Sequence, residues 1–266
     1  METRVVPVRD GMFQAHVLHG GSGEPLIFLH GAGGLHEGRY LEDLAARFTV
    51  YAPWHPGFGP TEGIEHVDDI IDLALYYHDV MDALGLESAC VIGHSMGGML
   101  AAELAALCSH RVRRLVLANP VGFWRDDDPV LDFFGLSPEE LVPYIIHDPQ
   151  SEAVREAFPI PEEPEALMEA LFQRFQAFAA AGKFMWPIPD KGLKRRIHRI
   201  QAPTLIIWGE SDRLVSPSYA EDFRSRIKGA RAVILKECAH MPMFEKRDEF
   251  VSLVTEFLQE KAPARA

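Results

Sequence analysis

A serine lies between two glycines in the segment Gly93–Gly97, whose sequence is Gly-His-Ser-Met-Gly. This segment follows the apolar stretch Ala89–Ile92 and opens the small-residue helical pattern Met96–Ser109. A tight turn from strand to helix presents a serine hydroxyl as a nucleophile, and the flanking glycines leave room for that turn. The helix N-terminus adds free N–H groups and positive potential where an oxyanion develops. The segment therefore predicts that Ser95 is the nucleophile of an acyl-transfer reaction.

A serine nucleophile needs a base and an acid that orients the base. Of the twelve histidines, His240 is the one in a loop directly after the last predicted strand, Arg231–Leu235. Two carboxylates, Glu210 and Asp212, follow the strand before it. We assign Asp212 as the acid because it lies further round its loop, and Glu210 is the alternative. The resulting chain order of serine, acid and histidine is one that known catalytic triads use.

A second glycine-rich segment, His30–Gly34, has the sequence His-Gly-Ala-Gly-Gly and follows the predicted strand Leu26–Leu29. A dinucleotide-binding loop is excluded because the last glycine of that pattern would fall on His36. An oxyanion loop fits, with the backbone N–H groups of Ala32 and Met96 binding the tetrahedral oxyanion together. The alternative is a tight turn with no catalytic role.

The predicted catalytic residues need strands and helices to position them, and the sequence has the pattern of such elements. Short β-type stretches alternate with helical patterns, which predicts an α/β fold with a mostly parallel sheet and helices on both faces. The predicted strands are Leu26–Leu29, Phe48–Ala52, Ala89–Gly93, Arg114–Ala118, Thr204–Trp208 and Arg231–Leu235, after an antiparallel pair at Arg4–Val8 and Ala15–Leu18. The predicted helices are Tyr40–Ala46, Val67–Leu84, Met96–Ser109, Pro217–Arg226 and Asp248–Leu258.

The alternation stops over residues 121–199, which are rich in proline and aromatic residues and place apolar residues at helical spacing. We predict that this segment is a helical cap inserted into a core of residues 1–120 and 200–266. The cap should cover the C-terminal edge of the sheet, where open α/β sheets place their sites.

Composition and charge limit the binding partners and the cellular location that we expect for this protein. The net charge of −13 argues against a nucleic-acid partner, which needs a basic face. No apolar run approaches the roughly 18 residues of a membrane span, and the N-terminus lacks the pattern of a signal peptide. We therefore expect a cytoplasmic protein that does not bind membranes. The three cysteines show neither a disulfide framework nor a metal-ligand spacing, and the predicted chemistry needs no cofactor or metal.

Three motifs together are characteristic of one superfamily. They are the turn Gly93–Gly98, the stretch Pro203–Val215 and the segment Pro56–Gly59, in which Trp54-His55 stand where an aspartate with a structural role often precedes Pro-Gly. On these motifs the chain resembles the α/β-hydrolase superfamily over nearly its whole length. The resemblance implies the α/β-hydrolase fold with a helical cap, and a serine hydrolase with an esterase-like site.

The stretch Leu193–Ile200 is similar to hydrolases that cleave carbon–carbon bonds in the meta-cleavage products of aromatic degradation. Those enzymes typically carry Asn before the nucleophile and Trp after the catalytic histidine, where this chain has His94 and Met241. The resemblance therefore favours an esterase, and the carbon–carbon hydrolase is the alternative. The alternative needs a cationic side chain in the cap to hold a substrate carboxylate, and Arg155 or Arg174 could serve.

The expected substrate is a small-molecule ester with an apolar portion, because the cap is rich in aromatic side chains. The candidate substrate-binding residues are Phe175, Trp186 and Met241. Two further alternatives use the same scaffold. One is a receptor that binds a small ligand without turnover or with slow turnover. The other is an acyltransferase or perhydrolase, which differs from an esterase only in the nucleophile that releases the acyl group.

Overall fold

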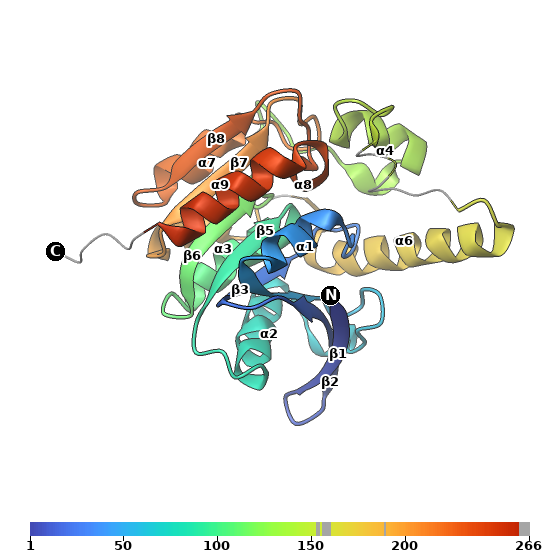
Figure 1. Cartoon of the computed structure of the whole chain (residues 1–266). Coiled ribbons are helices and arrows are strands. Elements are labelled where there is room, and N and C mark those ends of the chain that lie inside the picture. The colour runs from blue at the N-terminus through green and yellow to red at the C-terminus, as the bar shows by residue number, and fades with distance from the viewer. Residues whose placement is uncertain (153–154, 156–160, 189, 261–266) are drawn as a thin grey trace.

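The computed structural model describes residues 1–152, 155, 161–188 and 190–260 of the 266-residue chain. Its strands are β1 (Glu2–Val8), β2 (Phe13–Gly20), β3 (Glu24–Leu29), β4 (Phe48–Pro53), β5 (Ala89–His94), β6 (Val112–Ala118), β7 (Thr204–Gly209) and β8 (Arg231–Leu235). They form one sheet in the order β1-β2-β4-β3-β5-β6-β7-β8 (Figure 1). The pairs β1–β2 and β2–β4 are antiparallel and all others are parallel, so the predicted α/β-hydrolase fold is confirmed.

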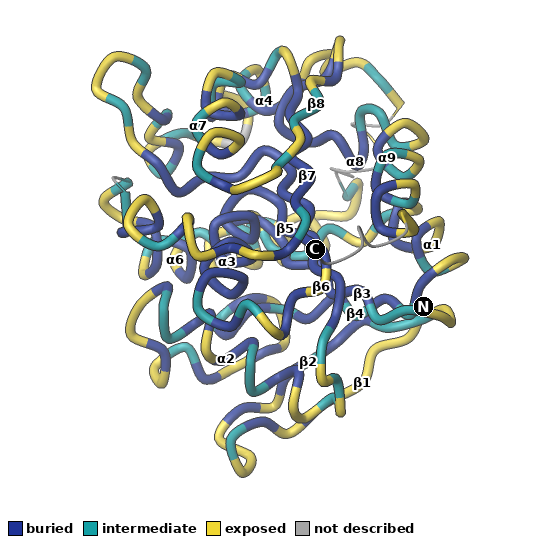
Figure 2. Tube along the Cα trace, turned by 90° about the vertical axis from the view of Figure 1, so that its left-hand side faces the viewer, coloured by how far each residue is buried: buried dark blue, intermediate teal, exposed yellow. Residues whose placement is uncertain are grey.

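The described part of the chain contains eight α-helices and four short 3-10 helices, and two of the α-helices fall in one long insertion between β6 and β7. The helices are α1 (Arg39–Ala45), α2 (Ile70–Ala83), α3 (Met96–Leu107), α4 (Pro138–Ile145), α6 (Pro164–Met185), α7 (Tyr219–Arg226), α8 (Pro242–Glu245) and α9 (Arg247–Gln259). Helices α1 and α9 lie on one face of the sheet, and α2, α3 and α7 lie on the other (Figures 1 and 2).

The parallel strands are the buried centre of the molecule. Every residue of β5 and β7 is buried, as expected for strands covered by helices on both faces. Strands β3 and β6 are buried over their last four and last five residues, so the centre of the sheet is buried where these strands end (Figure 2). The six predicted parallel strands are confirmed, and each starts and ends within two residues of its prediction.

Helix α2 begins later than predicted, at Ile70 rather than Val67. The side chain of Asp69 accepts hydrogen bonds from the backbone N–H groups of Ile71 and Asp72, at 2.7 and 3.0 Å. Asp69 is therefore the N-cap, and it satisfies two N–H groups that have no partner within the helix. The short helix α8 directly after the predicted base was not predicted, because four residues are too few to show a helical period.

Residues 121–199 contain helices α4 and α6, three 3-10 turns and no strand among the residues described there. This segment lies over the loops that follow β7 and β8. The Arg213 N–H donates to the Tyr144 carbonyl and the His240 N–H donates to the Ile145 carbonyl, both at 3.0 Å. The N-terminal half of α6 extends away from the sheet (Figure 1). These contacts place the segment beside the loops at the C-terminal ends of β7 and β8, and its role as a cap stays a prediction.

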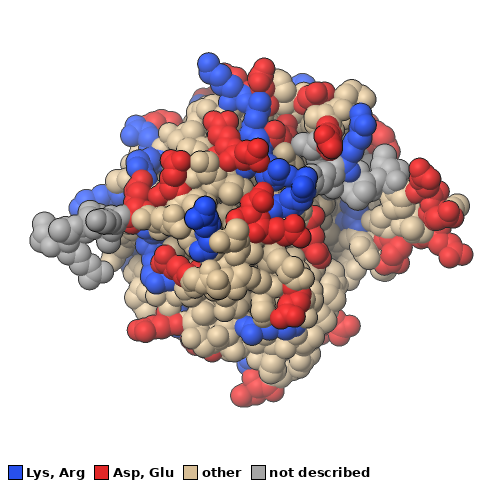
Figure 3. All heavy atoms as spheres, in the orientation of Figure 1, with Lys and Arg blue, Asp and Glu red and all other residues tan. Residues whose placement is uncertain are grey.

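The surface mixes both signs of charge. On the face drawn in Figure 3, Lys and Arg side chains alternate with Asp and Glu side chains and form no continuous basic stripe. Of the described helices, none has the length and apolar character that a membrane crossing requires.

Candidate active site

Ser95 lies on the turn between β5 and α3 with φ of 54° and ψ of −117°, a conformation that is strained for a residue with a side chain. The neighbouring glycines explain how the turn fits. A Cβ on Gly93 would overlap the carbonyl oxygen of Gly97, and a Cβ on Gly97 would overlap that of Leu29. The segment Gly93–Gly97 is therefore the sharp turn that the sequence predicted.

Backbone hydrogen bonds to the last residue of β6 and to the loop after it hold the strained turn in place. The Ser95 N–H donates to the Ala118 carbonyl at 3.0 Å, and the Val121 N–H donates to the Ser95 carbonyl at 3.2 Å. The same carbonyl also accepts the N–H groups of Gly98 and Met99 in the first turn of α3. Because the surrounding structure fixes the turn in this way, a strained conformation persists there.

The structure brings the predicted base and acid together. The Nδ1 atom of His240 lies 2.8 Å from Oδ2 of Asp212, and both side chains are buried. The other carboxylate oxygen of Asp212 accepts the N–H groups of Leu214 and Val215, each at 3.0 Å. Glu210, the alternative acid, is exposed. The geometry therefore favours Asp212 as the orienting acid.

Asn119 is a residue of this site that sequence reasoning missed. Its Nδ2 donates to Oδ2 of Asp212 at 2.6 Å and to the carbonyl of Ala239 at 3.2 Å. It is fully buried, and its φ of 45° lies in the left-handed region that Asn tolerates better than most residues. A signal was available, since Asn119 is the single asparagine of the chain and directly follows a strand.

The serine turn, the histidine loop and the glycine-rich loop converge. His94 precedes the serine, and its Nε2–H donates to the carbonyl of His240 at 2.8 Å while the two rings lie 5.0 Å apart. A Cβ on Gly31 would lie 3.2 Å from the Cβ of Ser95 and 3.1 Å from Nδ1 of His94. Glycine at position 31 thus allows the predicted oxyanion loop to approach the nucleophile closely.

The predicted oxyanion donors lie on these two loops. Ala32 is in a turn closed by the Gly34 N–H, which donates to the Gly31 carbonyl at 3.1 Å. Met96 is the first residue of α3, so the helix itself offers its N–H no acceptor. The role of these two N–H groups in oxyanion binding stays a prediction.

Residues 26–253 match the model of the alpha/beta hydrolase family. The chain belongs to this family. It is 26% identical to 2-hydroxy-6-oxo-6-phenylhexa-2,4-dienoate hydrolase of Comamonas testosteroni over 94% of this chain and 92% of the relative. It is 25% identical to Lipase 3 of a Moraxella species over 84% of this chain and 74% of the relative. A meta-cleavage product hydrolase from Pseudomonas fluorescens superposes with a TM-score of 0.75 at 23% identity, covering 96% of this chain and 97% of that one, and shares the fold.

Two buried histidines support the glycine-rich loop of this α/β hydrolase. Nε2 of His30 accepts the backbone N–H of His55 at 3.1 Å, so the single proton of the neutral ring is on Nδ1, which donates to the Gly31 carbonyl at 2.8 Å. Nε2 of His55 donates to the His30 carbonyl at 2.9 Å, so its Nδ1 accepts the Tyr77 hydroxyl at 2.5 Å. His55 therefore does structural work in the loop at a position where the superfamily often has aspartate.

Burial keeps these histidines neutral. It lowers the pKa of His55 to about 4, and it lowers the pKa of His30 well below the usual value. Burial first and the nearby Arg174 guanidinium second lower the pKa of His36 to about 4. Burial and the neighbouring His240 lower the pKa of His94 to about 3.

These pKa values predict that this α/β hydrolase loses stability as the pH falls below 6.5. An unfolded histidine titrates near pH 6.5, so between pH 6.5 and about 4 the unfolded chain binds more protons than the folded chain. Stability then falls with pH, by about 2 kcal/mol per buried histidine at pH 5. Urea unfolding at pH 7.5 and pH 5.0 measures the difference.

Two variants check the origin of that difference. His198 is exposed, so His198→Gln should keep the wild-type difference between the free energies of unfolding at the two pH values. His36→Gln should reduce that difference by the contribution of one histidine. Equal free energies of unfolding at the two pH values would contradict the account of neutral buried histidines.

The three candidate substrate-binding residues differ in how far they are buried. Met241 is 5% exposed and directly follows the base in the chain, and its part in substrate binding stays a prediction. Phe175 is 74% exposed on α6, and Trp186 is 53% exposed with its ring 5.9 Å from that of Phe134. Neither aromatic residue is enclosed in a pocket here, and their part in substrate binding stays a prediction.

Arg155 and Arg174, the two side chains that could hold a substrate carboxylate, also differ in exposure and in their contacts. The guanidinium of Arg155 is exposed and donates to the Gln150 carbonyl at 3.2 Å. Arg174 is half-buried, lies over the Phe178 ring at 5.2 Å, and is close enough to His36 to lower its pKa. The charge of Arg174 therefore acts on His36, two residues after the loop His30–Gly34.

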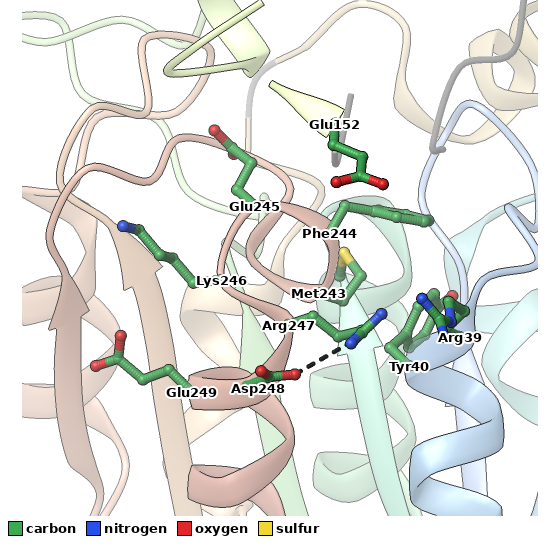
Figure 4. A pocket seen from close by; sticks show the side chains of 10 residues that line it. All are labelled: Arg39, Tyr40, Glu152, Met243, Phe244, Glu245, Lys246, Arg247, Asp248 and Glu249. Carbon is green, nitrogen blue, oxygen red and sulfur yellow. Dashed lines mark hydrogen bonds and ion pairs between the residues drawn. The ribbon is translucent and has the colours of Figure 1, made fainter. Parts of the chain in front are cut away.

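A cavity of about 460 Å³ lies between α1, α8 and α9 (Figure 4). Of the predicted site residues, none lines it. Its lining residues are Arg39, Tyr40, Glu152, Met243, Phe244, Glu245, Lys246, Arg247, Asp248 and Glu249.

Proposed function

We propose that this α/β hydrolase cleaves carboxylic esters by a two-step acyl transfer. The observation that carries the proposal is the buried bond between Nδ1 of His240 and Oδ2 of Asp212, together with Ser95 on its strained turn. The bond fixes the imidazole tautomer that leaves Nε2 free to accept a proton. The mechanism requires no metal or cofactor.

In the first step, His240 takes the hydroxyl proton of Ser95 as Oγ forms a bond to the ester carbonyl carbon. The carbonyl oxygen becomes an oxyanion, and in this proposal it is bound by the N–H groups of Ala32 and Met96. The C–O bond to the alcohol then breaks, and the alcohol leaves with the proton from His240. Water attacks the acyl-enzyme by the same route in reverse, and it releases the acid and restores Ser95.

The hydrogen bonds of His94 support an ester rather than a carbon–carbon substrate. An asparagine at this position would carry two side-chain N–H donors, whereas a neutral histidine carries one. His94 uses its single N–H on the His240 carbonyl, so none remains to donate to a substrate. Met241 is likewise buried in a position where the carbon–carbon hydrolases typically have Trp.

The second candidate is cleavage of carbon–carbon bonds in a meta-cleavage dienoate. It is supported by relatives named as such hydrolases and by Arg174, a half-buried cation of α6 whose charge acts on His36 and which could hold a carboxylate. The same triad would serve either reaction. A receptor without turnover and an enzyme that passes the acyl group to another acceptor stay further alternatives.

We expect short to medium aliphatic or simple aryl nitrophenyl esters to be hydrolysed faster than any meta-cleavage dienoate. The first reason is that the single N–H of His94 is already used on the His240 carbonyl, whereas the carbon–carbon hydrolases typically have Asn at this position. The second is that Met241 stands where those enzymes typically have Trp. The measurement is kcat/KM for esters of rising chain length beside a 6-phenyl dienoate. A dienoate preferred by a hundredfold or more would reverse the assignment.

A further inference from the structure

One carboxylate beside the proposed base binds three backbone N–H groups. Glu245, the last residue of α8, accepts the N–H groups of Ala239 and Met241 through Oε1, at 2.9 and 3.2 Å. Its Oε2 accepts the N–H of His147 at 2.7 Å. Hydrogen bonds to an ionised carboxylate are stronger than those between neutral groups. Glu245 thus binds both neighbours of His240 in the chain and the cap segment that follows α4.

The cap segment Ile145–His147 also contacts the base and the acid loop directly. The Ile145 carbonyl accepts the N–H of His240 at 3.0 Å. The side chains of His147 and Ser211 are joined by a hydrogen bond of 2.8 Å between Nδ1 and Oγ. As a result, each backbone N–H from Ala239 to Met241 bonds either to Glu245 or to this segment, and Glu245 lies where the cap, the acid loop and the base loop meet.

We propose that Glu245 is a positioning residue that holds the His240 imidazole in register with Ser95 and couples it to the cap segment Ile145–His147. This role rests on the proposed roles of Ser95 and His240 but not on the substrate class. Burial raises the pKa of the Glu245 carboxyl, and the three N–H groups oppose that rise by stabilising the ionised form.

The test is the rate at which an alkyl fluorophosphonate labels the protein. In this reaction Oγ of Ser95 bonds to phosphorus, fluoride leaves, and His240 takes the hydroxyl proton, so the rate reports the nucleophile and base without a choice of substrate. In Glu245→Gln only one acceptor oxygen remains on the side chain, so at least one of the three N–H groups faces an NH2 group. We expect labelling to slow about tenfold or more, because a misplaced imidazole is a poorer base.

The labelling rate per folded molecule separates positioning from a general loss of stability. A loss of stability alone would lower the folded fraction and leave the rate of each folded molecule unchanged, whereas a misplaced imidazole slows that rate in Glu245→Gln. Glu249→Gln is the matched control, because it removes one negative charge from a side chain that Figure 4 shows directed away from Glu245. It should label within twofold of the wild type.

The outcomes distinguish this inference from the proposed chemistry. Labelling of Glu245→Gln at the wild-type rate per folded molecule, with only a lower unfolding temperature, would overturn the positioning role alone. No labelling of the wild type would overturn the triad and the positioning role with it. If Glu245→Gln does not fold, Ser211→Ala removes the 2.8 Å bond to His147 and should slow labelling two- to fivefold. An unchanged rate in that variant would also overturn the inference.

Discussion

Replacement of Ser95 by alanine is expected to abolish turnover while the protein stays folded. Loss of the nucleophile should lower kcat by about 10⁵ to 10⁶, leaving only the contribution of oxyanion binding and substrate placement. Alanine should be tolerated because the space of the hydroxyl is small and the turn is fixed by backbone bonds to Ala118 and Val121. Hydrolysis of a nitrophenyl ester and circular dichroism measure the two effects together.

The strain at this position supplies a control. Alanine meets the same steric conflict as serine at a φ of 54°, so Ser95→Ala should unfold at nearly the wild-type urea concentration. Ser95→Gly relieves the conflict and should be equally inactive, yet at least as stable as Ser95→Ala. Activity of Ser95→Ala within tenfold of the wild type would remove Ser95 from the mechanism.

Asp212→Asn is expected to cost about 10⁴-fold in kcat, as the same change does in the serine-protease triad. One oxygen of Asp212 accepts two backbone N–H groups, so an asparagine should keep its oxygen there and turn its NH2 group toward His240. The imidazole must then accept at Nδ1 and carry its proton on Nε2, which prevents it from acting as a base toward Ser95. Steady-state hydrolysis of the ester measures the loss.

Glu210→Gln is the matched control for that variant, since it changes an exposed carboxylate two residues away in the same loop. It should leave kcat within about twofold of the wild type. A loss in Glu210→Gln equal to that in Asp212→Asn, or larger, would move the role of the acid to Glu210.

The arrangement of the sheet could be predicted because the pattern behind it is local. Strands such as β5 and β7 are buried on both faces and so appear as short apolar stretches in the sequence. The serine turn and the chain order of the acid and the histidine follow from that alternation. The bond between Asp212 and His240 then follows from parallel strands ending at one edge of the sheet.

The supporting residues could not be predicted, since their roles depend on contacts between distant segments. Asn119 contacts Asp212 across 93 positions of the chain, and Glu245 contacts the N–H of His147 across 98. His55 looked like a departure from the aspartate often found before Pro-Gly, and its role depends on a contact with Tyr77. No period or spacing encodes such contacts. The substrate-binding residues were equally out of reach, because side-chain packing in the cap decides them.

The central claim is that catalysis passes through an ester of the substrate acyl group with Ser95. Rapid acid quench of the enzyme during turnover of nitrophenyl acetate, followed by mass spectrometry of its peptides, tests this claim most directly. We expect an acetyl group on the peptide that contains Ser95, present within the first turnover and missing from Ser95→Ala. Release of nitrophenol at the steady-state rate with the Ser95 peptide unmodified throughout would contradict the account.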